Sequence, residues 1–281
     1  MWRSKLALLC ALLFYVSGFN GVAYAELILS SPPRESPAAG QKMYAPLAEQ
    51  LSRLLGTRVI YHHPGNWLRY QVDMRHNRFD IVFDGPHFAS WRIKYHQHTP
   101  LVKLPGTLKF YLITLRDLTH INVPKDLAAH RVCVIPPPNL SALVLLARLD
   151  GPAREPIIQP IKGGVKKAYQ GLLDRDCDAA VVRSTFFDEK LTEQQRAQLK
   201  ILFASPELPN QVITVSDALT AQQRAAMKDW LLAGEGRAVA EPVVRRFTGN
   251  QQQHFVDILG NEYTGYSSLL EDVVLGWRRS R

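Results

Sequence analysis

A short turn after a buried strand carries residues well suited to bind an anion. The apolar run at residues 79–83 predicts the strand, and the turn at residues 84–88 follows it. Gly85 allows the chain to turn sharply, and Pro86 stiffens the exit from the turn. Backbone N–H groups at the start of a following helix can then point at a negative charge. We therefore expect Gly85, Pro86 and His87 to lie against a bound anion.

Tyr44 offers a ring and a hydroxyl that could reach the rim of such a site. It falls in a predicted helix, residues 40–55, whose apolar side chains recur at steps of three and four and which Gly56 ends. The alternative is an ordinary half-buried aromatic that packs without touching a ligand. The sequence leaves both interpretations open.

Six of the nine histidines fall between residues 62 and 98, and five of them form the candidate cluster: His62, His63, His87, His96 and His98. The last two form a His-x-His pair, a spacing that zinc and copper sites use. However, the run around this pair is polar, and no cysteine or cluster of carboxylates accompanies it. We therefore expect solvated histidines and no metal site, with a metal-binding carrier as the alternative.

The elements that must position these residues alternate between short apolar strands and amphipathic helices. Strands are predicted at residues 26–30, 58–61, 79–83, 108–115, 131–135, 157–161, 178–182, 201–203 and 211–216. Helices are predicted at residues 40–55, 67–77, 141–149, 164–173 and 191–199, and residues 220–281 are mainly helical. This order favours mostly parallel sheets covered on both faces. Ligands of such sheets bind outside the carboxyl ends of the strands.

The alternation divides into two α/β lobes. Residues 26–115 and 205–281 are predicted to form lobe I, and residues 116–204 lobe II. The chain would then cross between the lobes twice, along residues 108–115 and again near residues 206–211. Two crossings make a hinge, and closure of the hinge on a ligand is the expected motion.

The motifs at the strand ends resemble those of the phosphate/phosphite/phosphonate-binding periplasmic proteins of ABC importers. In order they are Ser30-Ser31-Pro32-Pro33, Tyr44-x-Pro46-Leu47-Ala48, Asp84-Gly85-Pro86-His87, Asp126-Leu127, Ala168-Tyr169 and Ser184-Thr185. The resemblance extends over most of the chain. It implies the type II-like fold of periplasmic binding proteins, in which two lobes close on a ligand like a hinged clamp, and it adds Ser31 to the expected ligand-binding residues.

The second lobe departs from the pattern of this family. Relatives carry a Ser/Thr-rich turn after the strand at residues 131–135, whereas here residues 136–138 are three prolines, which lack N–H donors. Asn139 and Ser141 are the polar side chains that remain to face a ligand. Arg183 stands where many relatives have an acidic residue that recognises an amino group. A cation there suits a carboxylate or phosphate and repels an amine, unless Arg183 is a surface residue paired with Asp188 or Glu189.

Residues 1–25 have the organisation of an export signal. Arg3 and Lys5 give a positive start, an apolar stretch follows at residues 6–19, and Ala23 and Ala25 place small residues where signal peptidase cleaves. An uncleaved membrane anchor is the alternative, although the apolar stretch is shorter than the roughly 20 residues that span a bilayer. We expect cleavage after Ala25 and a mature chain in the periplasm.

The mature chain would be basic. The formal charge is +9 for the full sequence, and loss of Arg3 and Lys5 lowers it to +7 (9 − 2). A basic exported protein can attract small anions, lipid headgroups or polyanions, although general solubility explains the charge equally well. Lys and Arg are scattered rather than interleaved with aromatic residues, which argues against nucleic acid as a partner.

Two cysteines remain after cleavage, Cys133 and Cys177. Each lies in or beside an apolar strand pattern, so neighbouring strands could bring them together, and an oxidising compartment would allow a disulfide. Two buried free thiols are the alternative that we prefer here, because the sequence does not give the Cα separation that a disulfide needs.

Together these features predict an exported solute-binding protein that captures a small anion, such as phosphate, phosphite or a phosphonate, for an ABC importer. The expected partners are the anion and an ABC permease, and the chain is expected to be a monomer. One alternative is a module that signals to a membrane sensor kinase or cyclase, and the other is the metal-binding carrier that uses the His62–His98 cluster. The sequence shows no nucleophile elbow, P-loop or pair of catalytic carboxylates, so we expect neither catalysis nor a cofactor.

Overall fold

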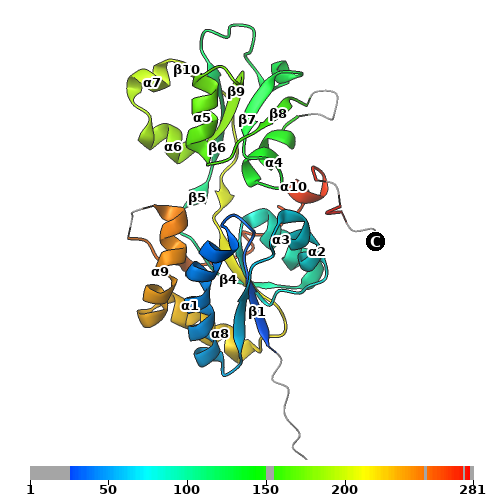
Figure 1. The fold of residues 1–281 in the computed structure, drawn as a ribbon, viewed down its shortest axis with the longest axis vertical. Coiled ribbons are helices and arrows are strands. Elements are labelled where there is room, and N and C mark those ends of the chain that lie inside the picture. The colour runs from blue at the N-terminus through cyan, green and yellow to red at the C-terminus, as the bar shows by residue number, and fades with distance from the viewer. Residues whose placement is uncertain (1–25, 150–154, 250–251, 275, 279–281) are drawn as a thin grey trace, which may run out of the picture.

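The structure is a computed structural model that describes residues 26–149, 155–249, 252–274 and 276–278. The predicted export signal lies outside these ranges. Two α/β lobes, one above the other in Figure 1, are each built on one sheet flanked by helices. The predicted two-lobed α/β fold is thereby confirmed. No helix in the described ranges is long and apolar enough to cross a membrane.

Lobe I, the lower lobe in Figure 1, contains a six-stranded sheet in the order β13-β4-β12-β3-β1-β2. Its strands are β1 (Leu27–Ser30), β2 (Val59–His62), β3 (Ile81–Asp84), β4 (Thr99–Lys103), β12 (Val212–Val215) and β13 (Val256–Asp257). Its helices are α1 (Pro37–Leu55), α2 (Trp67–Arg75), α3 (Pro86–His96), α8 (Ala221–Leu232) and α9 (Gly234–Thr248). A helix after Pro86 was expected without bounds, and β4 was not predicted as a strand.

Lobe II, the upper lobe, contains a five-stranded sheet in the order β10-β6-β9-β7-β8. Its strands are β6 (Phe110–Leu115), β7 (Arg131–Val134), β8 (Ile157–Pro160), β9 (Ala179–Arg183) and β10 (Leu199–Ala204). Its helical elements are the 3₁₀ turn η1 (Pro124–Leu127), α4 (Leu140–Leu146), α5 (Val165–Leu173), α6 (Ser184–Lys190) and α7 (Glu193–Ala197).

Both sheets are mixed rather than mostly parallel. In lobe I, β1 runs parallel to β2 and β3, whereas β12 is antiparallel to β3 and β4. In lobe II, β7 runs parallel to β8 and β9, whereas β6 is antiparallel to β9 and β10. The parallel pairs follow the β-α-β units that the sequence predicts. The antiparallel strands β6 and β12 enter their sheets directly after a crossing between lobes, so no helical crossover forces them to run parallel.

Local sequence explains the helix that carries Tyr44. Ser36 caps the start of α1 by accepting a hydrogen bond from the backbone N–H of Ala39, and Pro37 occupies the first turn. Gly56 ends the helix in the left-handed conformation, with φ of 62°. Between these ends, the buried positions recur at the helical period and pack into the core of lobe I: Gly40, Tyr44, Leu47, Ala48, Leu51 and Leu55.

The two crossings between the lobes lie side by side. β5 (Thr107–Leu108) leaves lobe I and pairs antiparallel with β11 (Leu208–Pro209), which returns to it. The apolar run at residues 108–115, predicted as one strand, is therefore divided at Lys109. β6 belongs to the sheet of lobe II because it pairs with β9 and β10, so the predicted boundary at residue 115 is too late. The boundary at residue 205 stays a prediction.

The C-terminal segment contacts both lobes. The short helix α10 (Ser268–Glu271) lies between α3 of lobe I and α4 of lobe II, where Figure 1 shows it in red. Leu270 and Trp277 are buried in one apolar cluster with Trp91 of α3 and Leu143 of α4. The Trp91 indole N–H also donates a hydrogen bond of 3.0 Å to the carbonyl of Trp277. We call residues 263–278 the C-terminal strap.

Cys133 and Cys177 form a disulfide. Their Cα atoms are 5.7 Å apart, inside the range that the bond requires. The bond joins β7 to the loop that precedes β9, and both residues are buried in an apolar cluster of lobe II. The preference for two free thiols was therefore wrong, because the parallel pairing of β7 with β9 brings the cysteines together.

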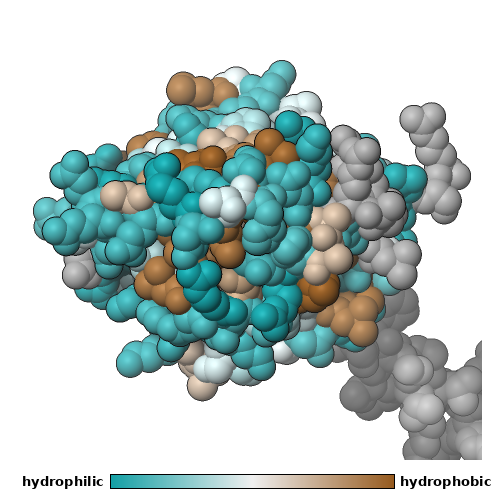
Figure 2. Space-filling view, turned by 90° about the horizontal axis from the view of Figure 1, so that it is seen from above, coloured by the Kyte–Doolittle hydropathy of each residue, from teal (hydrophilic) through white to brown (hydrophobic). Residues whose placement is uncertain are grey.

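The surface at the lobe II end of the molecule is mainly polar. Figure 2 looks onto this end and shows apolar side chains in small groups among hydrophilic ones. Small separated groups are ordinary on a protein surface in contact with water.

Candidate functional site: a cationic cavity between the lobes

A cavity of about 240 Å³ lies between the two lobes. The loops that follow β3, β7 and β9 reach it, as expected for a site at the carboxyl ends of strands. From lobe I, the residues around it include Arg34, Trp67, Gly85, His87, Arg246 and Phe247. From lobe II they include Ile135, Pro138, Asn139, Ser141, Gly164 and Arg183.

A second, more open depression of about 510 Å³ is unrelated to these strand ends. Its lining includes Glu26, Gly56 and Arg58, at the amino ends of β1 and β2. A ligand in an α/β sheet binds at the opposite end of the strands. We therefore assign the candidate site to the cavity between the lobes.

The cavity is cationic. Arg34, Arg183 and Arg246 reach it from three separate elements, and none of the described residues that line it carries a carboxylate. Arg34 and Arg246 both approach the ring of Phe247, with guanidinium carbons 5.7 Å and 5.4 Å from its centre. Arg246 is also paired with Glu35, outside the lining, at 3.0 Å. Three guanidinium groups around one cavity favour an anion and disfavour an amine.

Arg183 has a polar atom that lacks a partner. Its Nε is buried and makes no hydrogen bond to any described residue. Burial lowers the pKa of the guanidinium from its ordinary value, yet an arginine stays charged at neutral pH. Neither Asp188 nor Glu189 pairs with it in the described structure, so the alternative of a surface ion pair is not observed. A buried cation with an unused donor is arranged to bind something else.

His87 links the lobes and is electrically neutral. Its Nε2 lies 3.1 Å from the carbonyl oxygen of Pro138, across the cleft in lobe II. Burial and the neighbouring charge of Arg34 lower its pKa to about 3. Its second ring nitrogen, Nδ1, is buried and has no hydrogen-bond partner among the described residues. Gln211 adds another such atom to the lining, since its Oε1 is also buried and has no partner in the described part of the chain.

Gly85 is required by close packing rather than by an unusual backbone. It caps the start of α3 with φ of −78°, a value open to any residue. A Cβ added to it would lie 2.8 Å from Cε1 and 3.1 Å from Nδ1 of His87, and 3.9 Å from Nη2 of Arg34. The absent side chain therefore leaves the space that His87 and Arg34 share.

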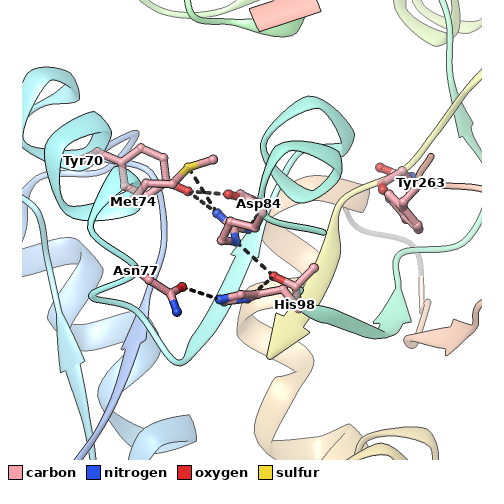
Figure 3. Close-up of polar contacts among 9 residues, drawn as sticks. Tyr70, Met74, Asn77, Asp84, His98 and Tyr263 are labelled. Atoms are coloured by element: carbon pink, nitrogen blue, oxygen red, sulfur yellow. Dashed lines mark hydrogen bonds and ion pairs between the residues drawn. The ribbon is translucent and has the colours of Figure 1, made fainter. Parts of the chain in front are cut away.

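A buried polar network fixes the turn that carries Gly85 and His87. Asp84 accepts hydrogen bonds from the Tyr70 hydroxyl and, at 2.7 Å, from Arg92 Nη2, and all three side chains are buried. Figure 3 shows this network beneath α3. Since Asp84 immediately precedes Gly85, and Arg92 lies further along α3, the ion pair ties the last residue of β3 to the helix that follows it.

The network continues to His98. Arg92 Nε donates to the Thr214 hydroxyl of β12 at 3.2 Å, and that hydroxyl lies 3.4 Å from His98 Nδ1. His98 Nε2 lies 3.0 Å from Asn77 Oδ1. Burial and the charge of Arg92 lower the pKa of His98 to about 2, so this ring is also neutral.

The structure brings most of the predicted site residues to the cavity. Gly85, His87, Asn139, Ser141 and Arg183 all line it. Asn139 caps α4, and its Oδ1 accepts hydrogen bonds from the Ser141 backbone N–H at 3.1 Å and from the Ser141 hydroxyl at 2.8 Å. The two polar side chains of this turn therefore satisfy each other in part.

Three predicted residues lie outside the residues that line the cavity: Ser31, Tyr44 and Pro86. Tyr44 is fully buried and stacks on Tyr61, with ring centres 4.9 Å apart. The Tyr61 hydroxyl also lies 3.2 Å from the Ser31 hydroxyl. The location of Tyr44 matches the alternative of a packing aromatic, because α1 turns this side chain toward the core of lobe I.

Sequence reasoning missed Arg34, Trp67, Gln211, Arg246 and Phe247, all of which line the cavity. Arg34 could have been found, since it directly follows the Ser31–Pro33 motif after β1. Arg246 and Phe247 lie near the end of α9, far along the chain, and no local pattern marks them. Only the packing of α9 against α1 brings them to the site.

The histidine cluster of the sequence is dispersed in the structure. His87 lines the cavity, and His98 is buried in the network of Figure 3. His63 donates from Nε2 to the carbonyl of Glu35 and accepts at Nδ1 from the backbone N–H of Gly65. The described residues contain no group of three or more His, Cys, Asp or Glu placed to hold a metal ion. The structure therefore gives the metal-carrier alternative no support.

Residues 29–263 match the family model described as ABC transporter, phosphonate, periplasmic substrate-binding protein. The match covers most of the chain, and the chain belongs to this family. The resemblance expected from the strand-end motifs is thereby confirmed. Members of the family are binding components of transporters that work in the periplasm, and phosphonate or phosphate transport is their common role.

Individual relatives are distant in sequence and close in fold. A curated relative, the phosphate-import protein PhnD of Mycolicibacterium smegmatis, is 24% identical over 69% of this chain and 67% of its own. Prochlorococcus marinus PhnD1, solved in complex with methylphosphonate, aligns with a TM-score of 0.61 at 14% identity over 87% of this chain and 96% of its own. XAC2383 from Xanthomonas citri, solved bound to ATP, aligns with a TM-score of 0.66 at 15% identity over 88% of this chain and 98% of its own.

Proposed function

We propose that this protein is exported to the periplasm, where it captures a small phosphorus oxyanion between its lobes and delivers it to an ABC importer. Phosphate, phosphite and phosphonates are the candidate ligands. The observation that carries the proposal is the cavity lined by Arg34, Arg183 and Arg246 without a carboxylate. The partners are the anion and the permease, and the protein acts as a monomer with its export signal removed after Ala25.

The relatives support a phosphorus-containing ligand. Phosphate, methylphosphonate and ATP are named for three proteins of similar sequence or fold. All three molecules present oxygens on a tetrahedral phosphorus atom to the protein. A cavity of about 240 Å³ accommodates a small oxyanion with room to spare. Its aromatic lining, which includes Trp67, Phe110 and Phe247, can take an organic substituent as well.

The proposal is tested by a ligand screen on the purified mature chain. Thermal unfolding is followed with phosphate, phosphite, methylphosphonate, ATP, acetate and zinc, since a ligand bound only by the folded state raises the melting temperature. Isothermal titration then gives the affinity of each ligand that stabilises the protein. We expect at least one phosphorus oxyanion to bind and acetate and zinc not to. Stabilisation by zinc alone would instead favour the metal carrier, and no response to any phosphorus compound would refute the proposed ligand class.

A further inference from the structure

The hydrogen bond between the lobes fixes which nitrogen of His87 carries a proton. The carbonyl oxygen of Pro138 can only accept, so the His87 Nε2 that lies 3.1 Å from it must donate. The ring is neutral, because burial and the charge of Arg34 lower its pKa to about 3. A neutral imidazole has one N–H, which leaves Nδ1 as a bare acceptor.

This acceptor belongs to a residue that lines the cavity. His87 is 1% exposed, and Nδ1 has no partner in the part of the chain that the structure describes. A Cβ on Gly85 would stand 3.1 Å from Nδ1 of His87 and 3.9 Å from Nη2 of Arg34, so both groups lie beside Gly85. An unpaired buried acceptor is costly, so a ligand that supplies a donor to Nδ1 is favoured.

The arginines of the cavity require acceptor atoms on the ligand, whereas His87 Nδ1 requires a donor. The guanidinium groups of Arg34 and Arg183 only donate, so they require oxygens that accept. Gln211 can present either end of its amide and decides nothing by itself. A ligand oxygen that approaches both Arg34 and His87 must therefore accept from one and donate to the other, which requires a hydroxyl on the anion.

Resting on the function proposed above, we propose that His87 Nδ1 accepts a hydrogen bond from the P–OH group of a protonated phosphorus oxyanion. The cleft thereby selects such anions over fully deprotonated ones of the same shape. Phosphate keeps at least one P–OH at neutral pH, whereas sulfate keeps no S–OH and would place a bare oxygen against the lone pair of Nδ1. Because Pro138 belongs to lobe II, the acceptor is fixed only when the lobes touch, so selection acts on the closed molecule.

Two substitutions test the roles of the two ring nitrogens of His87 separately. In His87→Gln, an amide N–H can occupy the place of Nε2 and donate to Pro138, but no acceptor stands at the place of Nδ1. In His87→Asn, the shorter amide can keep an acceptor near Nδ1 and loses the reach to Pro138. Isothermal titration at pH 7 with inorganic phosphate and with sulfate is carried out on the wild type and both variants, and thermal unfolding checks that each variant is folded.

We expect the wild type to prefer phosphate over sulfate by at least tenfold. In His87→Gln this preference should fall roughly ten- to a hundredfold, the range for one hydrogen bond to a charged group. His87→Asn should retain more of the preference. Equal affinity of the wild type for phosphate and sulfate would overturn the role of His87. This result requires no variant, and it leaves the proposed function standing. If neither phosphate nor any other phosphorus oxyanion binds, the selection proposal and the proposed function both fail.

Discussion

Arg183 departs from the pattern expected of relatives and lines the cavity between the lobes. It stands at the end of β9, where the strand meets α6, and it reaches the cavity from lobe II. Its Nε is buried without a hydrogen-bond partner among the described residues, and burial lowers the pKa of the group. Folding has thus removed water from a cation without supplying a full set of acceptors. The cost of that desolvation is recovered only if an anion binds.

Replacing Arg183 by lysine should therefore weaken the binding of phosphorus oxyanions. Lysine keeps the charge but loses the planar fork that holds two oxygens at once. We expect a loss of roughly ten- to a hundredfold in affinity, from about 1.5–3 kcal/mol for a charge-assisted hydrogen bond. Isothermal titration measures this loss. Arg175→Lys is the matched control on the same lobe, because Arg175 pairs with Asp117 at an exposed site outside the cavity. Equal affinities of the Arg183 variant and the wild type would remove Arg183 from the site.

Gly85→Val should obstruct the site from the opposite lobe. The new Cβ would lie 2.8 Å from the His87 ring, so the ring must move away from Pro138. The backbone at Gly85 is open to any residue, hence we expect the variant to fold. Titration should show weakened binding, and circular dichroism should show retained secondary structure. Normal affinity in this variant would mean that the site lies elsewhere.

At the scale of the elements, the β-α-β units were predictable from the spacing of apolar residues, because that spacing repeats along the whole of a strand or helix. The strands around residues 27–30, 59–62, 81–84, 131–134 and 179–183 were found within one or two residues. The bounds of α3 were not predicted because its buried face includes His87, Ser90 and Arg92, so it lacks an apolar stripe. The paired crossings β5 and β11 were missed as strands because two-residue elements carry no period.

The candidate site was predictable only where its residues follow a strand. Gly85, Asn139 and Arg183 could be found because each comes directly after an apolar strand or its turn. Arg246 could not, since it reaches the cavity through the packing of α9 on α1. Whether Tyr44 points to the cleft or to the core depends on how α1 is oriented on the sheet. The helical period of the apolar residues does not distinguish these two orientations.

The junction of β3 and α3 should depend on its buried ion pair. Asp84→Asn leaves Arg92 without a countercharge in a site where both side chains are at most 1% exposed. We expect the free energy of unfolding to fall by about 3–5 kcal/mol, as for other broken buried pairs. Urea denaturation measures it. Asp117→Asn, which breaks the exposed pair with Arg175, is the control and should cost under about 1 kcal/mol. A loss for Asp84→Asn no larger than that of the control would contradict this account.

At the scale of the whole molecule, two buried neutral histidines make stability depend on pH. The folded protein lowers the pKa of His98 to about 2 and that of His87 to about 3, from an ordinary 6.5. Above pH 6.5 both rings are neutral whether the chain is folded or not. Below it, the unfolded chain binds protons that the folded one excludes. The free energy of unfolding should therefore fall as the solution is acidified, by about 1.4 kcal/mol per pH unit for each histidine.

Urea denaturation between pH 6.5 and pH 5 checks this dependence, in a window above the titration of ordinary carboxylates. Replacing His98 by glutamine should make the slope shallower by about half of the histidine contribution. His254→Gln, at an exposed position, should leave the slope unchanged. A slope that His98→Gln does not alter would show that another group controls the acid sensitivity.

The C-terminal strap adds a connection between the lobes besides the two crossings. α10 lies between α3 and α4, and Trp277 shares one apolar cluster with Trp91 and Leu143. Opening of the cleft must therefore part an apolar contact as well as bend the β5–β11 ribbon. The closed state should therefore open slowly. The rate of opening, rather than the rate of encounter with the ion, should then limit how fast a ligand enters the cleft. In stopped-flow experiments, the observed rate of binding should then level off as the concentration of phosphate rises, and a chain ending before the strap should show a higher plateau.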